Sequence, residues 1–378
     1  AAISFAKVRF SYAEVGNPPR FGVANPVFSL VDDSFRPAPF ADYRPERTKS
    51  YEAGMELRFL HDRLSLNATV YQSNTTNQLL VQPLLGSSIY TVFFYNAGNI
   101  RTRGIEASLS HRGKFGALDW TSGLVFSLNR NQVMRLSEGF INPATGEPYE
   151  NEQRLVGGLG DFQNVLTVGG SMADFYISQV LREDNQGNLW VNPGDGSIGR
   201  TTIPRRYVGR ATPDYTLGWN NQFSYKGVDL SFLVDARVGG IGVSYTQSIM
   251  DAFGVSEQSA LDRDNGGVLI YGKTYPNVQG YYNMLGQGAS GMAAYYIYSA
   301  TNVRLREVAL GYHLPAKWFS PKGPQIRLAL TGRNVFMFYN KSPFDPESTS
   351  STGTYDQGID YFRQPSYRSF GFSIRAQF

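Results

Sequence analysis

The three histidines of the chain, His61, His111 and His313, are the side chains best suited to acid–base chemistry. A hydrolytic site needs a nucleophile, a base and a third group that orients the base, all within hydrogen-bonding distance. Each histidine instead falls in or next to a short turn between predicted strands. We therefore expect no catalytic residues and no enzymatic activity. A histidine-dependent hydrolase is the alternative, which intact activity after replacement of all three histidines would exclude.

One stretch of the sequence is a weak candidate for a metal-binding site. The stretch Asp262-Arg-Asp-Asn-Gly-Gly267 resembles the start of a calcium-binding loop, but it lacks the acidic residue that ends a twelve-residue loop of that kind. The chain has no cysteine, which excludes disulfides and thiolate metal sites. We predict no metal site and no cofactor, and we interpret residues 262–267 as a solvated turn, with an ion site as the alternative.

Aromatic side chains gather in segments without a strand pattern. Such rings can stack on sugar rings or pack against peptide side chains. They can also pack against one another, form an interfacial girdle or contact a partner protein. Tyr281 and Tyr282 lie in segments of this kind. The residues that we predict to contact a substrate are Phe93, Phe94, Tyr95, Trp190, Tyr295, Tyr296 and Tyr298.

The elements that must position these side chains are strands of alternating polarity. In the final stretch, Phe370, Phe372, Ile374 and Phe378 alternate with polar neighbours, which is the period of a β-strand. The stretch has the length of about 9–11 residues that crosses a bilayer as a tilted strand. In a closed barrel the apolar face meets lipid, the polar face meets the lumen and every edge is paired.

The same alternation recurs along the chain and predicts an all-β, antiparallel transmembrane β-barrel. About ten strands are expected, near 4–13, 51–59, 64–71, 104–111, 118–129, 215–225, 228–237, 294–313, 326–331 and 367–378. The strand at 294–313 changes phase, which predicts a bulge near Arg306 and Glu307. A helix is predicted within 245–260, and a hairpin between 175–180 and 188–191.

The connections between these strands alternate in length. Short connections fall at 61–63, 112–117, 226–227 and 314–324, and long loops at 14–48, 75–100, 131–213, 240–293 and 339–366. Outer-membrane barrels place short turns in the periplasm and long loops outside the cell. With a periplasmic C-terminus, every connection falls on the required side. We therefore interpret the whole chain, 1–378, as barrel wall with long extracellular loops.

Composition excludes several other classes of protein. The net charge is +4 with dispersed basic residues, which argues against a nucleic-acid partner. Aromatic residues make up 14%, typical of β-barrels with aromatic girdles. No apolar run approaches the ~18 residues of a transmembrane helix. The first ten residues do not resemble a signal peptide, so we expect a removed signal or a start within a longer protein.

Several stretches resemble conserved segments of SusC/RagA-type TonB-dependent outer-membrane transporters. They are Tyr95-Asn-Ala-Gly-Asn-Ile-Arg-Thr-Arg-Gly-Ile-Glu106, Asn302-Val-Arg-Leu-Arg-Glu-Val-Ala-Leu-Gly-Tyr312 with Leu314-Pro315, Gly332-Arg-Asn-Val-Phe336, Phe344-Asp-Pro-Glu347 and Pro365-Ser-Tyr-Arg-Ser-Phe-Gly-Phe372. These segments follow the family's order and together extend over about three quarters of the chain. The match is more specific than any one motif alone.

The resemblance implies the C-terminal part of a barrel of about 22 strands, with the plug and remaining strands outside this sequence. It implies import of oligomeric nutrients, glycans or peptides, across the outer membrane of a Gram-negative, Bacteroidetes-like bacterium. The implied partners are a SusD-like surface lipoprotein, the TonB complex acting through the plug, and lipid with lipopolysaccharide. The alternatives are a passive porin or small complete outer-membrane barrel, and a soluble β-protein used in adhesion.

Overall fold

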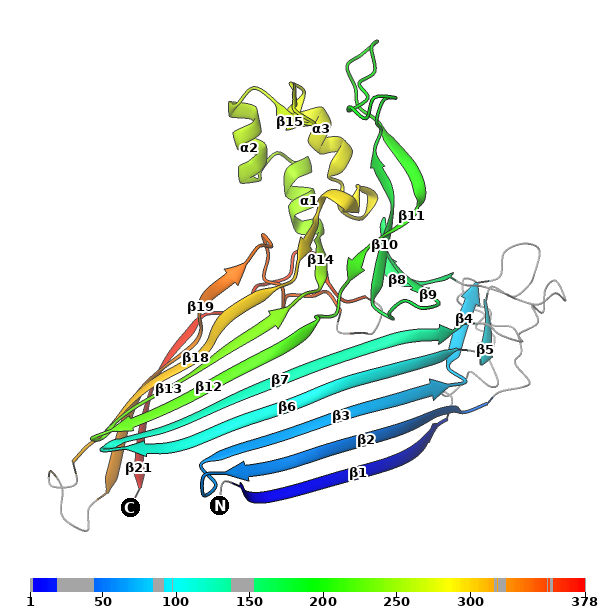
Figure 1. The fold of residues 1–378 in the computed structure, drawn as a ribbon. Coiled ribbons are helices and arrows are strands. Elements are labelled where there is room, and N and C mark those ends of the chain that lie inside the picture. The colour runs from blue at the N-terminus through cyan, green and yellow to red at the C-terminus, as the bar shows by residue number, and fades with distance from the viewer. Residues whose placement is uncertain are drawn as a thin grey trace, which may run out of the picture. The chain divides into compact units, whose positions relative to one another are not determined.

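The computed structural model describes residues 3–18, 44–83, 92–96, 98–136, 153–315, 318, 324–351, 353 and 356–377. Ten strands form one sheet in the order β1-β2-β3-β6-β7-β12-β13-β18-β19-β21 (Figure 1). Their bounds are β1 Ile3–Asn17, β2 Glu46–Phe59, β3 Leu64–Thr76, β6 Asn99–Phe115, β7 Leu118–Arg135, β12 Tyr215–Tyr225, β13 Val228–Val238, β18 Asn302–His313, β19 Gln325–Asn340 and β21 Ser369–Gln377. Pairing is antiparallel between β1 and β2, β2 and β3, β12 and β13, β13 and β18, β18 and β19, and β19 and β21. The prediction of about ten antiparallel strands is confirmed.

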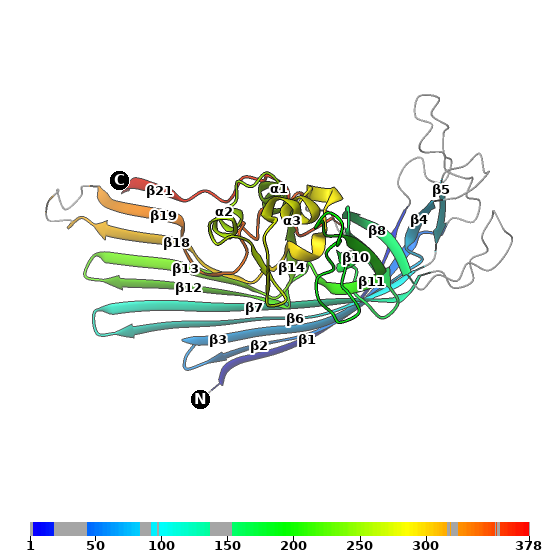
Figure 2. The ribbon, with the colours of Figure 1, turned by 90° about the horizontal axis from the view of Figure 1, so that it is seen from above.

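The chain divides into two compact units. The first comprises residues 1–109, 126–154 and 166–172, and the second comprises residues 110–125, 155–165 and 173–378. The second unit contains the helices, and Figure 2 shows its strands β12, β13, β18, β19 and β21 side by side. Within the described residues, no helix is both long and apolar enough to cross a membrane.

Tight turns join consecutive strands of the large sheet. Residues 60–63 join β2 to β3, residues 116–117 join β6 to β7, and Lys226 and Gly227 join β12 to β13. Lys226 and Gly227 have φ angles of 47° and 89°. A two-residue turn with positive φ at both positions matches the twist of the strands that it connects. The short turns predicted at these places are confirmed, although the second is shorter than expected because β6 continues to Phe115.

One face of the sheet presents apolar side chains to the outside. Leu230, Leu310, Leu330 and Phe372 are successive cross-strand partners on β13, β18, β19 and β21. Their exposed fractions are 36%, 50%, 61% and 62%, and Leu124 of β7 is 41% exposed. A contiguous apolar surface is unfavourable in water but normal on the lipid face of a membrane barrel. The apolar side chains at these positions share one uncovered face of the sheet, as the sequence pattern predicts.

The opposite face of the same strands carries charge. Arg327 of β19 donates a hydrogen bond from Nε to Oδ1 of Asp229 on β13 at 3.0 Å, across the intervening strand β18. Gly311 of β18 lies between the two side chains, and a Cβ there would come within 2.5 Å of both. The ion pair therefore depends on a residue without a side chain at position 311.

A β-bulge interrupts β18 where the sequence pattern changes phase. Leu233 of β13 pairs with Glu307, and Val234 pairs with Leu305, so Arg306 is an extra residue in β18. An extra residue shifts the alternation by one position. Apolar side chains before and after Arg306 therefore stay on the same face of the sheet, and the predicted bulge is confirmed.

Smaller elements occupy the connections between the long strands. A four-stranded sheet has the order β11-β10-β9-β8, a three-stranded sheet has the order β17-β14-β20, and β15–β16 and β4–β5 form two further pairs. The strands are β4 Leu79–Pro83, β5 Val92–Asn96, β8 Gln153–Leu159, β9 Phe162–Thr167, β10 Asp174–Leu181, β11 Arg200–Arg210, β14 Ile241–Ser244, β15 Val268–Ile270, β16 Lys273–Tyr275, β17 Ile297–Ser299 and β20 Ile359–Asp360. The helices are α1 Tyr245–Ala252, α2 Glu257–Asp264, α3 Val278–Leu285, η1 Gly288–Ser290 and η2 Ala293–Tyr295.

The buried core of the second unit lies among these smaller elements. The rings of Phe162 and Phe175 stack with centroids 3.9 Å apart, and Val243, Tyr245 and Met292 are fully buried in the same cluster. These elements therefore pack as in a water-soluble protein, in contrast to the large sheet with its uncovered apolar face.

Two predictions for these segments were wrong in detail. Residues 175–180 pair with β11 and β9, and not with residues 188–191, because the chain extends into a longer hairpin before it returns as β11. The helix predicted within 245–260 is two helices. Gly254, with a φ of 66°, follows the end of α1, and the Ser256 side chain caps the start of α2.

Exchange of Leu330 for arginine should destabilise the membrane-inserted protein, whereas the same exchange at Thr331 should be tolerated. Leu330 lies on the exposed apolar face, and the next residue of the strand points to the opposite face. An arginine facing lipid near the bilayer midplane costs about 2–4 kcal/mol of unfolding free energy. Urea unfolding in phospholipid vesicles measures this difference, and equal effects of Leu330→Arg and Thr331→Arg would contradict the assignment of the two faces.

Candidate functional site

Three of the aromatic side chains predicted to contact a substrate lie on the wall of one pocket. Tyr295, Tyr296 and Tyr298 line a pocket of about 860 Å³ in the second unit, together with Tyr281 and Tyr282. Residues of α1 and α2, the start of β15 and a proline of the 341–348 segment complete the wall. We take this pocket as the candidate functional site.

The other predicted contact residues have different surroundings. Trp190 lies between β10 and β11, where the guanidinium carbon of Arg182 is 4.0 Å from the centroid of its ring. Trp190 does not line the tyrosine pocket. Phe93, Phe94 and Tyr95 belong to β5, and their side chains lie outside the described part of the structure.

Side-chain caps fix the helices around the pocket. The Ser244 hydroxyl accepts a hydrogen bond from the Gln247 N–H at 3.0 Å at the start of α1, and it donates to Asp360 at 2.7 Å. Ser256 caps α2 and Asn277 caps α3 in the same manner. Caps satisfy N–H groups that the first turn of a helix leaves unpaired. They matter here because helices of eight residues are not stable on propensity alone.

Two buried carboxylates belong to the pocket wall. Asp262 accepts hydrogen bonds from the Tyr282 hydroxyl at 2.6 Å and from the Gln258 amide at 3.0 Å. Asp251 accepts one from the Gln247 amide at 2.8 Å. Both are buried, with 6% of Asp251 and 8% of Asp262 exposed. The stretch 262–267 thus begins in the last turn of α2, where neighbouring side chains hold the carboxylate of Asp262. Residues 263–266 are exposed, and the predicted turn follows the helix at residues 265–266.

Tyr296 is the most buried of the five tyrosines, with 2% exposed. Its hydroxyl lies near Asp251, but no hydrogen bond of normal geometry satisfies it. Burial first, and then the charge of Asp251, raises the pKa of Tyr296 far above its ordinary value. Burial also raises the pKa of Tyr281 and of Tyr282. The pocket therefore presents neutral phenol rings at physiological pH.

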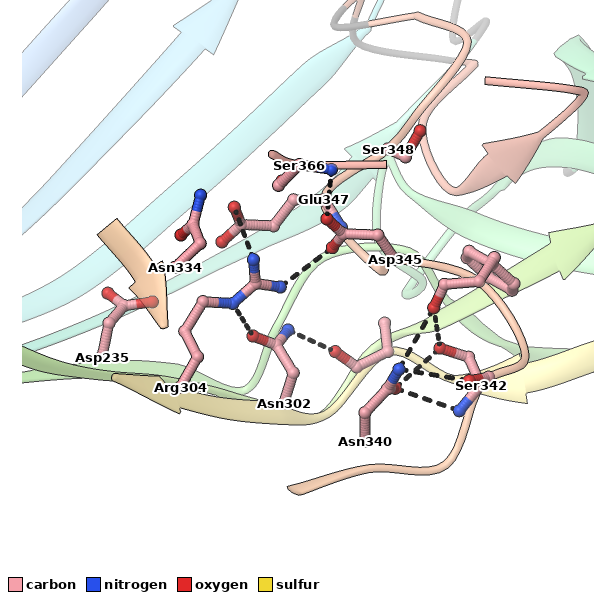
Figure 3. A network of polar contacts seen from close by, with 12 residues as sticks. Asp235, Asn302, Arg304, Asn334, Asn340, Ser342, Asp345, Glu347, Ser348 and Ser366 are labelled. Atoms are coloured by element: carbon pink, nitrogen blue, oxygen red, sulfur yellow. Dashed lines mark hydrogen bonds and ion pairs between the residues drawn. The ribbon is translucent and has the colours of Figure 1, made fainter. Parts of the chain in front are cut away.

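A buried ion-pair network holds residues 341–348 beside the pocket. Arg304 of β18, with 3% of its side chain exposed, donates to Asp345 at 2.9 Å and to Asn302 at 3.2 Å (Figure 3). Asp345 also accepts the backbone N–H of Ser366 at 2.9 Å. The guanidinium of Arg304, through Asp345, thereby links β18 to residues 341–348 and to Ser366, both of which follow β19 in the chain.

The bulge at Arg306 brings a second guanidinium to this network. Arg306 donates to Glu347 at 2.8 Å and to Asp235 of β13 at 2.8 Å. Glu347 also lies 3.4 Å from a terminal nitrogen of Arg304. The hydrogen bond from Arg306 lowers the pKa of Glu347, so this carboxylate stays ionised.

This network positions residues that contact the pocket tyrosines. The Asn340 side-chain amide donates to the carbonyl of Phe344 at 3.1 Å, close to the Asp345 anchor. Pro343 lines the pocket, and the ring centroid of Phe344 is 6.2 Å from that of Tyr298. Sequence analysis did not assign these residues to a site, although the segments 302–312 and 344–347 stood out by their resemblance to the transporter family.

The histidines lie on separate elements. His61 is in the turn between β2 and β3, the His111 ring is 4.8 Å from the Trp120 ring, and His313 Nε2 is 3.3 Å from Asp229. No group of three or more metal-ligating side chains is arranged around a metal site within the described ranges. The absence of enzymatic activity stays a prediction.

Comparison with known proteins identifies relatives along the whole chain. Residues 3–378 match the profile of the family described as TonB dependent receptor-like, beta-barrel. The TonB-dependent receptor P3 of Formosa agariphila is 25% identical over 401 residues, which is 98% of this chain and 39% of the receptor. The TonB-dependent receptor SusC of Bacteroides thetaiotaomicron is 24% identical over 346 residues, which is 88% of this chain and 32% of SusC. The chain thus spans about two fifths or less of these relatives, which are named as receptors and not as enzymes.

Solved structures share the fold. A structure of the RagAB peptide transporter has a TM-score of 0.72 and 18% identity, and the match covers 99% of this chain and 40% of that one. The RagAB peptide importer in its open-open state gives a TM-score of 0.72, 18% identity, and coverage of 100% and 40%. At this identity the likeness shows the fold alone.

Exchange of Arg304 for methionine should release residues 341–348 from the sheet. The change leaves the carboxylate of Asp345 buried without this cation, which costs about 3–5 kcal/mol. Hydrogen exchange of the 341–348 amides measures the opening free energy. The control Arg333→Met removes an ion pair with Glu307 whose side chains are 72% and 54% exposed, and it should cost less than about 1 kcal/mol. Equal protection in the two variants would contradict the role of Arg304.

Acid should loosen the same segment below about pH 4. Burial alone would raise the pKa of Asp345, but hydrogen bonds from Ser366 and Arg304 outweigh burial and lower the pKa to about 2. Because its pKa in an unfolded chain is about 4, the stabilisation is complete above that pH and is lost as the pH falls toward 2. Hydrogen exchange of residues 341–348, corrected for the intrinsic rate at each pH, should show this loss. The Asp345→Asn variant should show a weaker pH dependence, because Glu347 still titrates in the same segment, and the Asp345→Asn/Glu347→Gln variant should show a flat profile. An unchanged pH dependence in Asp345→Asn would point to another group.

Proposed function

Because the chain belongs to the TonB-dependent receptor β-barrel family, we propose that it forms wall and outer segments of an importer for oligomeric nutrients in a bacterial outer membrane. The fold is the antiparallel transmembrane β-barrel of that family. The observation that carries the proposal is the two-sided sheet, with Leu230, Leu310, Leu330 and Phe372 exposed on one face and the Asp229 pair on the other. This arrangement suits a wall between lipid and a polar lumen.

In the proposed mechanism, the nutrient is a glycan or a peptide that is too large for simple diffusion through a pore. A SusD-like surface lipoprotein closes the outer mouth over the bound nutrient. The TonB complex then supplies energy by acting on a plug inside the barrel. The chain itself contributes lipid-facing strands, a charged inner face and the outer segments that first meet the nutrient.

Within this proposal, the tyrosine pocket contacts the nutrient through Tyr295, Tyr296 and Tyr298. Its volume of about 860 Å³ lies in the range of small-ligand sites, so it accommodates a short part of an oligomer and not the whole chain. Neutral phenol rings provide flat apolar surfaces with a hydroxyl at the edge, which suits both sugars and peptide side chains. Trp190 and the β5 aromatics Phe93, Phe94 and Tyr95 are proposed as further contact residues outside this pocket.

Removal of two pocket rings should reduce nutrient uptake without disturbing the barrel. Loss of two ring contacts of about 0.5–1.5 kcal/mol each corresponds to roughly a 5- to 150-fold weaker interaction. Uptake of labelled casein peptides and of labelled plant oligosaccharides by cells measures the effect of a Tyr295→Ala/Tyr298→Ala variant. The control is Phe253→Ala, which truncates a side chain that is 78% exposed and outside the pocket.

Two outcomes of that experiment would count against the proposal. Unchanged uptake in the double tyrosine variant would remove the pocket from the transport route. Uptake that persists in cells without a functional TonB complex would favour a passive porin over an energised importer.

A further inference from the structure

The charge of the tyrosine pocket has a single sign. Asp251, Glu257 and Asp262 line it, and neither lysine, arginine nor histidine is present among the lining residues. In the described part of the chain, none of the three carboxylates takes part in an ion pair with a basic side chain. This contrasts with Asp345 and Glu347 beside the pocket, which are both paired with arginine.

Neutral donors compensate the buried carboxylates only in part. Asp262 accepts from a tyrosine hydroxyl and an amide, and Asp251 accepts a single hydrogen bond from the Gln247 amide. A buried carboxylate is strongly disfavoured unless it is paired or fully hydrogen-bonded. A cation that enters the pocket would therefore gain more at Asp251 than at a carboxylate that already has an arginine partner.

The Tyr296 hydroxyl is a second buried polar group of the pocket without a well-placed partner. It lies beside Asp251 but makes no hydrogen bond of normal geometry. A hydroxyl oxygen can accept a hydrogen bond from a ligand N–H group. The faces of the neighbouring tyrosine rings carry negative electrostatic potential, and they attract an ammonium or guanidinium group most strongly when water is excluded.

We propose that this pocket binds the protonated amino or guanidinium group of the imported oligomer, with Asp251 as counter-charge and the tyrosine rings around the cation. This inference rests on the proposed function and names the ligand chemistry of its site. A neutral sugar would bury Asp251 without a counter-charge, whereas an amine supplies both the positive charge and the N–H donors that Asp251 and Tyr296 lack.

Binding of amines and their neutral acetylated counterparts to the purified protein tests the proposal. The probes are trilysine against Nε-acetylated trilysine, and a glucosamine trimer against the N-acetylglucosamine trimer, measured by calorimetry at a pH where the amines are protonated. We expect at least one amine to bind roughly tenfold or more tightly than its acetylated form. The peptide and sugar arms distinguish the two possible sources of the cation.

Two substitutions localise this preference to the pocket. Asp251→Asn keeps the shape and a hydrogen-bond acceptor but removes the charge, and Tyr296→Phe removes only the hydroxyl. Both should weaken amine binding, the first by roughly tenfold, and leave the acetylated probes unaffected. The control Asp195→Asn removes the charge of an exposed carboxylate outside the pocket that accepts the backbone N–H of Ser197, and it should change neither.

Equal binding of amines and acetylated probes, or equal effects of Asp251→Asn and Asp195→Asn, would overturn the cation site. If either result is found and nutrient uptake still depends on Tyr295 and Tyr298, the proposed import function is retained and only the proposed ligand class is wrong. Amine binding that is lost in Asp251→Asn, with uptake unaffected by the tyrosine exchanges, would support the cation site and separate it from import.

Discussion

A strand that crosses hydrocarbon has no water to satisfy its backbone, so each N–H and C=O must pair with a neighbouring strand. The order of the ten-stranded sheet follows from this constraint, because each crossing strand pairs with the next crossing strand along the chain. Two-residue connections such as Lys226-Gly227 keep the pairing unbroken up to the turn. With the backbone satisfied in this way, side chains such as Leu330 and Phe372 are free to be apolar and uncovered.

The segments beyond the sheet follow the ordinary rules of proteins in water. Their rings and aliphatic side chains are buried in a cluster around Phe162 and Tyr245, and their short helices begin at capped positions. Within the second unit, ion pairs link the large sheet to the segments beyond it. Arg304 and Arg306 project from β18 and pair with Asp345 and Glu347. The same segment places Pro343 on the wall of the tyrosine pocket and Phe344 near the ring of Tyr298.

Sequence reasoning succeeded wherever the information is local. Alternation with a period of two residues is a property of adjacent side chains, and it identified the crossing strands, three of their short turns and the extra residue at Arg306. Most of the fourth predicted connection, 314–324, lies outside the described residues. The aromatic candidates were partly informative, because Tyr295, Tyr296 and Tyr298 do share a pocket wall.

The remainder of the site depends on contacts that alternation does not encode. Asp345 is 41 residues from Arg304, and Tyr282 is 20 residues from Asp262, so polarity patterns could not identify either pair. The same limit applied to β10, whose true partner β11 lies beyond an intervening hairpin. Segment 344–347 is an exception. Its resemblance to the transporter family singled it out, but that resemblance did not indicate which arginines it pairs with.

The extra residue in β18 has a consequence for how related sequences can vary. Deleting Arg306 would rotate the N-terminal half of the strand by one position relative to the half that follows. Val303 and Leu305 would then turn toward the aqueous interior, and the guanidinium of Arg304 would turn toward the acyl chains. Insertions and deletions at this point are therefore constrained far more tightly than amino-acid replacements, so the length of this strand should drift less in evolution than its composition.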